Sequence, residues 1–520
     1  MWFRNSPLRR HRLRFSAVSL VLIVLACIIL SAAGGRAVAA SHAGQAKGNL
    51  TVVIPVEPGS LNFDEDNHLS TLYIRELDVE NLIASNPTNF SALHTGLLTS
   101  WKPVNKRTWK FAVRKGVTFT NGEHFTAATA AWDINNEIKD NNPFTGPYIV
   151  GFKHAAAKGG ALIVRTKLPL PYLPQILTLI QAIPPTYYQK QGAQAFGHHP
   201  IGTGPFMFKS WTPGQRLVFA RNPHYYGVKA KLKTLTFTFA SEDTTRLNLL
   251  KTGGADIASN MPVADAPAGP GYTVQNVRTP LIMQMNFNLH SAPFNQRGVR
   301  LAAVEAINRS ELVKASFGPR GGEPYADLMP PYFKSSGHHK KVIKYNLAAA
   351  KAAVAKAGHP SIDVYWTSDG HYVNDVRVGQ IISGMLQAAG FKVTQHPMET
   401  GAFFTQLYTN KMPGISIWGG EAVFHNEAVE YQSSYGTKDA VLTYCLPPAV
   451  IKLFSKAVVL PDGAKRNRIY NEMEQIVDYK SICGMNLFMA RTAFAVSKHV
   501  HGFKASQTGI WSSLADTSVG

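Results

Sequence analysis

The residues whose types most suggest a binding site end one apolar strand, in the stretch GISIWGGEAVF. Trp418 offers a flat apolar wall, Gly419 and Gly420 leave the backbone bare, and Glu421 supplies a carboxylate. Bare backbone lets an extended peptide pair with N–H and C=O groups whatever its side chains are, and a carboxylate holds a cation by a charge-assisted hydrogen bond. The stretch predicts a site for a short peptide. The alternative is a solvated loop glutamate beside a core tryptophan.

Enzyme chemistry is not indicated elsewhere in the chain. The sequence contains no G-x-S-x-G, H-E-x-x-H, C-x-x-C or G-x-x-x-x-G-K motif, so the usual hydrolase, zinc and nucleotide signatures are absent. The acids at 64–66 resemble a carboxylate cluster, but adjacent acids on a polar loop are usually solvated, and glycosidase carboxylates come from separate elements. We therefore expect a binding protein without a cofactor, not an enzyme.

Histidines and cysteines raise two further hypotheses. The pairs His198–His199 and His338–His339 could suggest nickel or haem, but a metal site needs ligands that converge in a fixed geometry, so we interpret both pairs as surface groups. Beyond the N-terminal segment the only cysteines are Cys445 and Cys483. In an oxidising compartment two cysteines commonly pair, and we predict a disulfide; two unrelated buried thiols are the alternative.

The bulk composition is that of a soluble globular protein. The chain has 520 residues, 45% hydrophobic and 16% charged, which suits two or three domains with substantial cores. The net charge of +21 favours anionic surroundings such as membrane surfaces or wall polymers. Because the Lys and Arg residues are dispersed and no nucleic-acid fold signature accompanies them, we expect no nucleic-acid partner.

The N-terminus has the layout of a secretory signal. An arginine-rich start precedes an apolar run at 15–30, and the sequence Ala-Val-Ala at 37–39 suits cleavage before Ala40. We expect residues 1–40 to be a signal peptide and the mature protein to be extracytoplasmic. The alternative is a lipid anchor on Cys27, since VLAC resembles a lipobox, although the apolar run continues past that cysteine. The run is short for a full membrane span.

Local patterns predict alternating strands and helices. Thr126 suits the N-cap of a helix, a helix is expected over 243–251, and Ser310 and Gly318 are expected to cap another helix. Asn346 and Gly358 bound a further helix. From 361 to 420 strands and helices alternate, which implies parallel pairing in an α/β domain. In IGTGPFMFKSW, the glycines and proline of 202–205 predict a tight turn before a strand, with positive φ or a close backbone approach.

The order of four motifs resembles the extracellular solute-binding proteins of the peptide and nickel ABC-transporter family, known as family 5, which include the oligopeptide and dipeptide receptors. The motifs are GLLTSWKPVNKRTWKFAVRKGVTFTNGEHFTA, PIGTGPFMFKSW, RLVFARNPHYYG and FNLHSAPFNQRGVRLAAVEAINRSELV. They occur in the family's order and the resemblance covers nearly the whole mature chain.

The resemblance implies an α/β fold of the periplasmic-binding-protein type II, with two lobes on a hinge and an inserted third domain. Ligand would close the lobes over itself, a hinge motion. The implied segments are lobe I at 47–88, 196–275 and 481–520, domain II at 89–195 and lobe III at 276–480.

The resemblance also implies a function. A monomer would capture a short peptide or peptide-like solute and deliver it to a membrane ABC permease with its ATPase. In peptide-binding relatives an aspartate three residues after such a tryptophan takes the ligand's ammonium group, and Glu421 stands at that position here. His371 and Trp366 are expected to line the pocket, or to be packing residues.

Two departures from the family pattern leave other functions open. AVFHNE stands where the family has a second acid and a proline, and Gly370 and His371 stand near where some dipeptide receptors place an arginine. The alternatives are a non-peptide solute, such as a nickel chelate, haem or an oligosaccharide, and a surface sensor or adhesion protein without transport.

Overall fold

The structure is a computed structural model in which the chain forms two units, Met1–Gln45 and Ala46–Gly520. The description concerns the second unit alone. It covers residues 48–66, 71, 74–85, 93–141, 145–264, 266–331, 333, 335, 342–421, 426–436, 444–506 and 511–520. The expected signal peptide, Cys27 and the pair His338–His339 lie outside the described residues.

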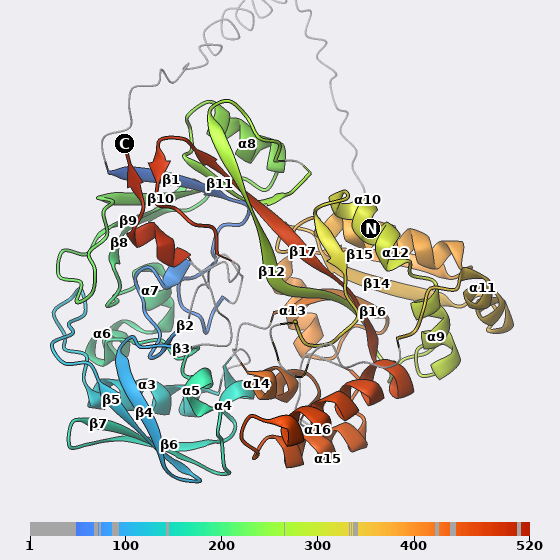
Figure 1. The fold of residues 1–520 in the computed structure, drawn as a ribbon, viewed down its shortest axis with the longest axis horizontal. Helices are drawn as coiled ribbons and strands as arrows, with labels where there is room; N and C mark the ends of the chain where they lie inside the picture. The colour runs from blue at the N-terminus through green and yellow to red at the C-terminus, as the bar shows by residue number, and fades with distance from the viewer. Residues whose placement is uncertain are drawn as a thin grey trace, which may run out of the picture. The chain divides into compact units, whose positions relative to one another are not determined.

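An 11-stranded mixed sheet organises the fold (Figure 1), in the order β15-β14-β16-β12-β17-β11-β1-β10-β9-β8, with β13 paired to β17. The long strands β12 and β17 are antiparallel and join the two halves of the sheet. The bounds are β1 Asn49–Ile54, β8 Phe206–Thr212, β9 Arg216–Arg221, β10 Thr234–Phe239, β11 Ile257–Pro262, β12 Tyr272–Phe287, β13 Gly322–Pro324, β14 Ser361–Thr367, β15 Lys392–Met398, β16 Ile415–Glu421 and β17 Gly484–Ser497.

The predicted parallel pairing is confirmed in the half that contains β16. Strand β14 is parallel to both β15 and β16, and the helices between them are α12 (Asp375–Ala388) and α13 (Thr400–Tyr408). Their core contains Val364, Ile417 and Leu386. Because the three strands are parallel, their carboxyl ends lie at one edge of the sheet.

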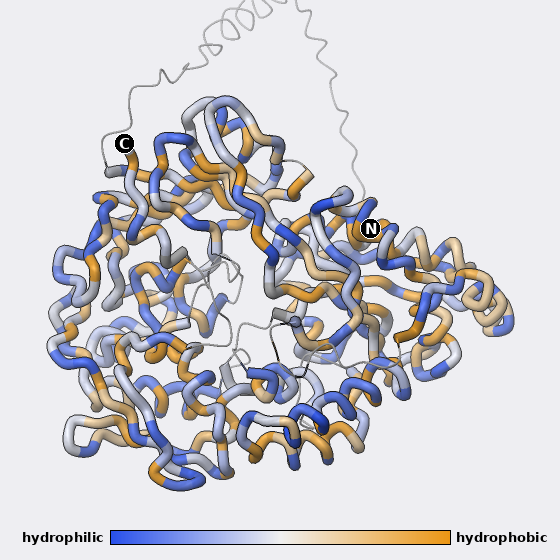
Figure 2. The backbone as a smooth tube through the Cα atoms, in the orientation of Figure 1, coloured by the Kyte–Doolittle hydropathy of each residue, from blue (hydrophilic) through white to orange (hydrophobic). Residues whose placement is uncertain are grey.

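A smaller antiparallel sheet has the order β4-β5-β7-β6, from β4 (Leu98–Asn105), β5 (Thr108–Val113), β6 (Phe152–Lys158) and β7 (Ala161–Thr166). Helix α3 (Ala127–Asp140) packs on it. The core of this sheet, which includes Phe111 and Leu162, continues into helices further along the chain, with Val429, Phe454 and Tyr470. Figure 2 shows both hydrophobic and hydrophilic residues along the backbone of the chain.

The other elements are short. The helices are α4 Gly146–Ile149, α5 Leu173–Ile176, α6 Pro185–Gln191, α7 Ala193–His198, α8 Asp243–Lys251, α9 Arg297–Glu305, α10 Arg309–Phe317, α11 Leu347–Lys356, α14 Glu427–Tyr431, α15 Pro448–Ala457 and α16 Ala464–Glu474. The π-helical segments are η1 Gln432–Gly436 and η2 Gln475–Ser481, and a 3-10 turn, η3, spans Trp511–Ala515. Four two-residue strands form two antiparallel pairs: β2 Ala84–Ser85 with β3 Leu93–His94, and β18 Val500–His501 with β19 Ser518–Val519.

Most predicted helix caps are confirmed and one is wrong. Thr126 caps α3, and Asn346 caps α11 by accepting from the N–H of Ala349. Ser310 does not cap α10. Asn308 does so instead, because its backbone is extended and its side-chain oxygen accepts from the N–H groups of Ser310 and Glu311.

The tight turn before β8 exists because the backbone of another segment passes against it. A Cβ on Gly202 would lie 1.9 Å from the carbonyl oxygen of Asp78, and one on Gly204 would lie 2.5 Å from that of Leu77. The N–H of Gly204 donates to the Asp78 carbonyl at 2.7 Å, and that of Phe206 to Leu77 at 3.0 Å. Of the two predicted reasons for glycine, the close approach is therefore the one that applies.

Candidate functional site

The end of β16 is built from the register of β12 and β16. Trp418 pairs with Gln284 and Gly420 pairs with Ile282. Directly opposed residues share a face and successive residues alternate, so Trp418 and Gly420 lie on the same face as Gln284. Gly419 lies on the other face, where a Cβ would meet Leu281 at 2.5 Å.

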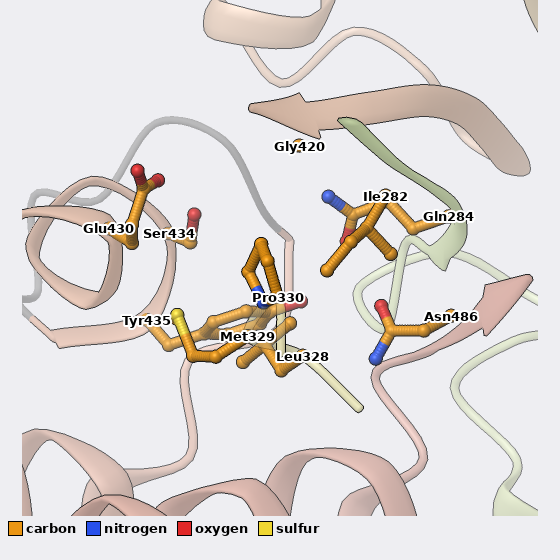
Figure 3. Close-up of a pocket in the computed structure, with 10 residues that line it drawn as sticks. All are labelled: Ile282, Gln284, Leu328, Met329, Pro330, Gly420, Glu430, Ser434, Tyr435 and Asn486. Carbon is orange, nitrogen blue, oxygen red and sulfur yellow. The ribbon is translucent and has the colours of Figure 1, made fainter. Parts of the chain in front are cut away.

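A cavity opens beside Gly420 (Figure 3). It holds about 380 Å³ of empty space, part of it open to solvent. Figure 3 shows Glu430 and Ser434 across the cavity from Gln284 and Gly420. The lining residues come from β12, β16, β17, the segment before residue 331, α14 and η1: Ile282, Gln284, Leu328, Met329, Pro330, Gly420, Glu430, Ser434, Tyr435 and Asn486.

The cavity offers hydrogen-bonding groups of several kinds. Gln284 and Asn486 are paired across β12 and β17 and supply side-chain amides, each with a donor and an acceptor end. Glu430 supplies a carboxylate, and Tyr435 a hydroxyl that donates to Asn286 Oδ1 at 3.3 Å. This set can bind a polar solute that carries a cationic group, with apolar contacts from Ile282 and the segment at 328–330.

Gly420 leaves room for Gln284. A Cβ on Gly420 would lie 2.6 Å from Gln284 Nε2, so the glycine is what allows the amide to lie over the strand. Gln284 itself is 6% exposed. The absence of a side chain at Gly420 therefore shapes the cavity wall.

Gly419 and His371 are connected through Tyr372. The Tyr372 hydroxyl donates to the carbonyl oxygen of Gly419 at 3.2 Å. The His371 ring lies edge-on to Tyr372, with centroids 4.4 Å apart, and packs against Phe404 at 5.5 Å. His371 is not among the residues that line the cavity.

The two predicted tryptophans are both buried but lie on opposite faces of the sheet. Trp366 pairs with Ile417, which places it on the face away from Trp418, and its ring packs where a Cβ on Gly379 of α12 would be. Trp418 is 4% exposed, and its Nε1 meets no acceptor among the described residues. Both tryptophans are packed in the same core; Trp418 lies on the face of β16 that also carries Gly420, but it is not among the residues that line the cavity.

The predicted anchor Glu421 is the last residue of β16. Its backbone pairs with Leu281. Its side chain is outside what the structure describes, so its role in ligand binding stays a prediction.

The other candidate groups have structural surroundings. Asp66 is buried and accepts from the N–H of Gly59 at 2.6 Å and the Thr71 hydroxyl at 2.8 Å, so it holds the loop after β1 and is not solvated.

His198 and His199 are exposed beside aromatic rings of β8. Across the described ranges, His, Cys, Asp and Glu side chains nowhere form a group of three that could hold a metal ion. Cys445 and Cys483 form a disulfide in the structure, with Cα atoms 5.4 Å apart.

Sequence reasoning missed Gln284, Glu430, Tyr435 and Asn486. A signal for two of them exists: Gln284 in LIMQMNF, which also contains Asn286, and Asn486 in CGMNLFMA are amides inside otherwise apolar strands. A polar group in a buried strand needs a partner, which points to a network or a ligand. Glu430 and Tyr435 have no comparable signal, because only the fold brings their helical segment to the strands.

Comparison with known proteins identifies the kind of protein this chain resembles. The family model described as bacterial extracellular solute-binding proteins, family 5, middle region, matches residues 92–440. The glutathione-binding protein GsiB of Salmonella choleraesuis (strain SC-B67) is 24% identical over 416 residues, which span 76% of this chain and 80% of that protein.

Solved structures agree on the fold. The dipeptide-binding protein of Pseudoalteromonas sp. SM9913, in complex with Met-Leu, superposes with a TM-score of 0.82 at 18% identity and covers 91% of this chain and 100% of its own. The periplasmic binding protein AgaA of A. tumefaciens R10, in complex with agropinic acid, gives 0.80 at 20% identity, covering 91% and 99%. The predicted two-lobe α/β fold of the periplasmic-binding-protein type is confirmed.

Proposed function

Because this chain belongs to family 5 of the bacterial extracellular solute-binding proteins, the substrate-binding components of ABC importers, we propose that its own solute is a short peptide or a peptide-like molecule. Members of the family act outside the cytoplasm and are not enzymes. No helix in the described part of the chain is long and apolar enough to cross a membrane. We propose that a membrane permease with its ATPase receives the solute.

The cavity beside Gly420 carries the proposal. A peptide presents an ammonium group and alternating N–H and C=O groups, and the cavity presents a carboxylate on Glu430 and amides on Gln284 and Asn486.

Closure over the solute is supported by the approach of two loops. A Cβ on Gly370, after β14, would lie 3.8 Å from the Cβ of Pro55, after β1. These loops follow the carboxyl ends of strands in the two halves of the large sheet, which is where open α/β sheets bind ligands. We propose that the solute is held between these loops and the cavity wall, with Glu421 as a second anchor at the end of β16.

Native mass spectrometry of the secreted protein, purified without denaturation, tests the proposal. Wild type is compared with Glu430→Gln, Glu421→Gln and the exposed control Glu472→Gln. Peptide masses that are retained in wild type and control but lost in Glu430→Gln would support a peptide receptor anchored by Glu430. A single non-peptide mass, or peptides retained in every variant, would contradict the ligand class or the anchor.

A further inference from the structure

Acidic residues are absent from two long stretches of the chain. No Asp or Glu occurs between Glu80 and Glu123, or between Asp140 and Glu242, although Lys and Arg recur in both stretches. The four strands of the smaller sheet, β4 to β7, fall in these stretches and contain no acidic residue. Their cations therefore have no acidic neighbour on the sheet.

The register gathers these cations on one face. Lys102 of β4 pairs with Lys110 of β5, and Lys110 pairs with Ile163 of β7. Two residues along β7, Arg165 shares that face, and it pairs with His154 of β6. Lys102, Lys110 and Arg165 are all exposed.

Lys158 extends the same face to the edge of the sheet. It pairs with Ala161, which lies two residues before Ile163 on β7, and it is exposed. None of the ion pairs within the described ranges involves Lys102, Lys110, Lys158 or Arg165. We call these four residues the basic face.

The opposite face of the sheet is the one that packs. Trp101, Phe111 and Leu162 pair across β4, β5 and β7, and Phe111 and Leu162 are fully buried in the core that includes Ile134 of α3. Since α3 and the core take this side, the basic face is left to solvent.

The hairpin between β4 and β5 adds an apolar group to the charge. Val104 is 57% exposed and is followed by Lys106 and Arg107, which are also exposed. An apolar tip flanked by cations suits the boundary of a lipid bilayer, where the apolar side chain enters and the cations meet phosphate groups.

We infer that the basic face and the tip of this hairpin dock the protein on an anionic phospholipid surface. The broad, acid-free sheet is complementary in charge to anionic phospholipid headgroups, and a substrate-binding protein must meet its permease at a membrane. Docking by this sheet would keep the protein at the membrane, where it can reach the permease by diffusing along the membrane surface. The inference does not depend on which solute the cavity beside Gly420 binds.

Each basic residue near an anionic bilayer strengthens binding roughly fivefold, and the effect is screened by salt. We therefore compare Lys102→Gln/Lys110→Gln/Arg165→Gln with Lys351→Gln/Lys356→Gln/Lys392→Gln. The second variant removes the same charge from exposed sites on α11 and β15. Both carry the same N-terminus, so any contribution of that segment cancels.

The experiment is sedimentation of the secreted protein with phosphatidylcholine vesicles that do or do not contain phosphatidylglycerol, in ~0.05 M and ~0.5 M salt. We expect binding only to the anionic vesicles at low salt, weakened roughly a hundredfold in the sheet variant and only a few-fold in the control. Equal weakening in both variants would overturn the inference, because net charge alone would then explain binding.

Soluble polyphosphate gives the remaining arm of the test. If it binds with the same dependence on the basic face while the anionic vesicles do not bind, the face recognises a soluble polyanion and the membrane assignment is wrong.

Native mass spectrometry of the sheet variant should show the same retained solute as wild type. A loss of that solute together with vesicle binding would indicate misfolding, so a third variant, Lys158→Gln alone, is run and should weaken binding roughly fivefold.

Discussion

The hydroxyl of Tyr372 donates a hydrogen bond to the carbonyl oxygen of Gly419 at 3.2 Å and thereby fixes the loop after β14 to the end of β16. The adjacent Gly420 lies on the other face of the strand, beside the cavity. The two neighbouring glycines therefore leave space for different groups. The Tyr372 ring packs against Gly419, and the amide of Gln284 lies against Gly420.

This difference predicts different costs for the same substitution. Gly419→Ala should lower the free energy of unfolding by about 1–3 kcal/mol, because its Cβ would lie 2.5 Å from Leu281 Cδ1 and 2.9 Å from the Tyr372 ring. Gly420→Ala should cost less stability, since Gln284 Nε2 ends a flexible side chain, but it should weaken solute binding. Urea unfolding and titration with the co-purified solute measure the two effects. Equal costs in stability would contradict this account.

The turn before β8 gives a second prediction. Gly202→Ala would place a Cβ 1.9 Å from the Asp78 carbonyl oxygen, a contact with backbone that cannot swing away, so we expect a loss of about 3 kcal/mol or more. Gly298→Ala in α9 is the control, because no atom lies within 4 Å of its added Cβ and alanine favours a helix. Thermal unfolding of both variants decides the matter: a Gly202→Ala protein as stable as Gly298→Ala would refute the close approach.

Local features of the fold could be predicted from the sequence. The helix at 243–251 and the caps Asn346 and Gly358 follow from residues next to one another, and the structure has them where expected. The sequence predicts Ser310 as the N-cap of α10, but the structure has Asn308. Both residue types are good N-caps, and only the backbone conformation decides between them.

The candidate site could be predicted only in part. The bare backbone at the end of β16 is visible in the sequence, but the partners of that strand are not. The cavity beside Gly420 is completed by Gln284, Asn486 and Glu430. They come together there because β12 lies between β16 and β17 and because α14 lies against the same cavity. The separation of Trp366 from Trp418 also follows from register, since a shift of one residue reverses the face of a side chain.

Buried carboxyl groups predict how stability depends on pH. Burial raises the pKa of Asp78 from 3.8 to about 8 and that of Glu80 from 4.5 to about 7. Because the folded-state pKa values lie above the unfolded ones, the folded protein holds protons that the unfolded chain has released. Stability from these groups is thus fully present below about pH 4 and is lost as pH rises to about 8, by up to about 1.4 kcal/mol per pH unit for each proton.

Asp78→Asn tests this pH dependence. The variant keeps an oxygen that can accept from the N–H of Phe208, a bond of 3.0 Å in the structure, but it cannot ionise. Its stability should fall less steeply between pH 5 and pH 8 than that of wild type, as ~1 proton fewer is released. Urea unfolding across this range, with exposed Glu242→Gln as control, provides the measurement. Parallel profiles for Asp78→Asn and wild type would contradict a raised pKa at Asp78.

The disulfide predicts a dependence of stability on reductant. Cys445 and Cys483 are separated by 38 positions in sequence, and both are buried beside the start of β17. A bond that closes such a loop restricts the unfolded chain, so opening it should cost about 2–4 kcal/mol. Thermal unfolding of wild type should shift down in a phosphine reductant, whereas Cys445→Ala/Cys483→Ala should start lower and not respond. A wild type that ignores the reductant and yields two free thiols on denaturation would show that the cysteines are not paired.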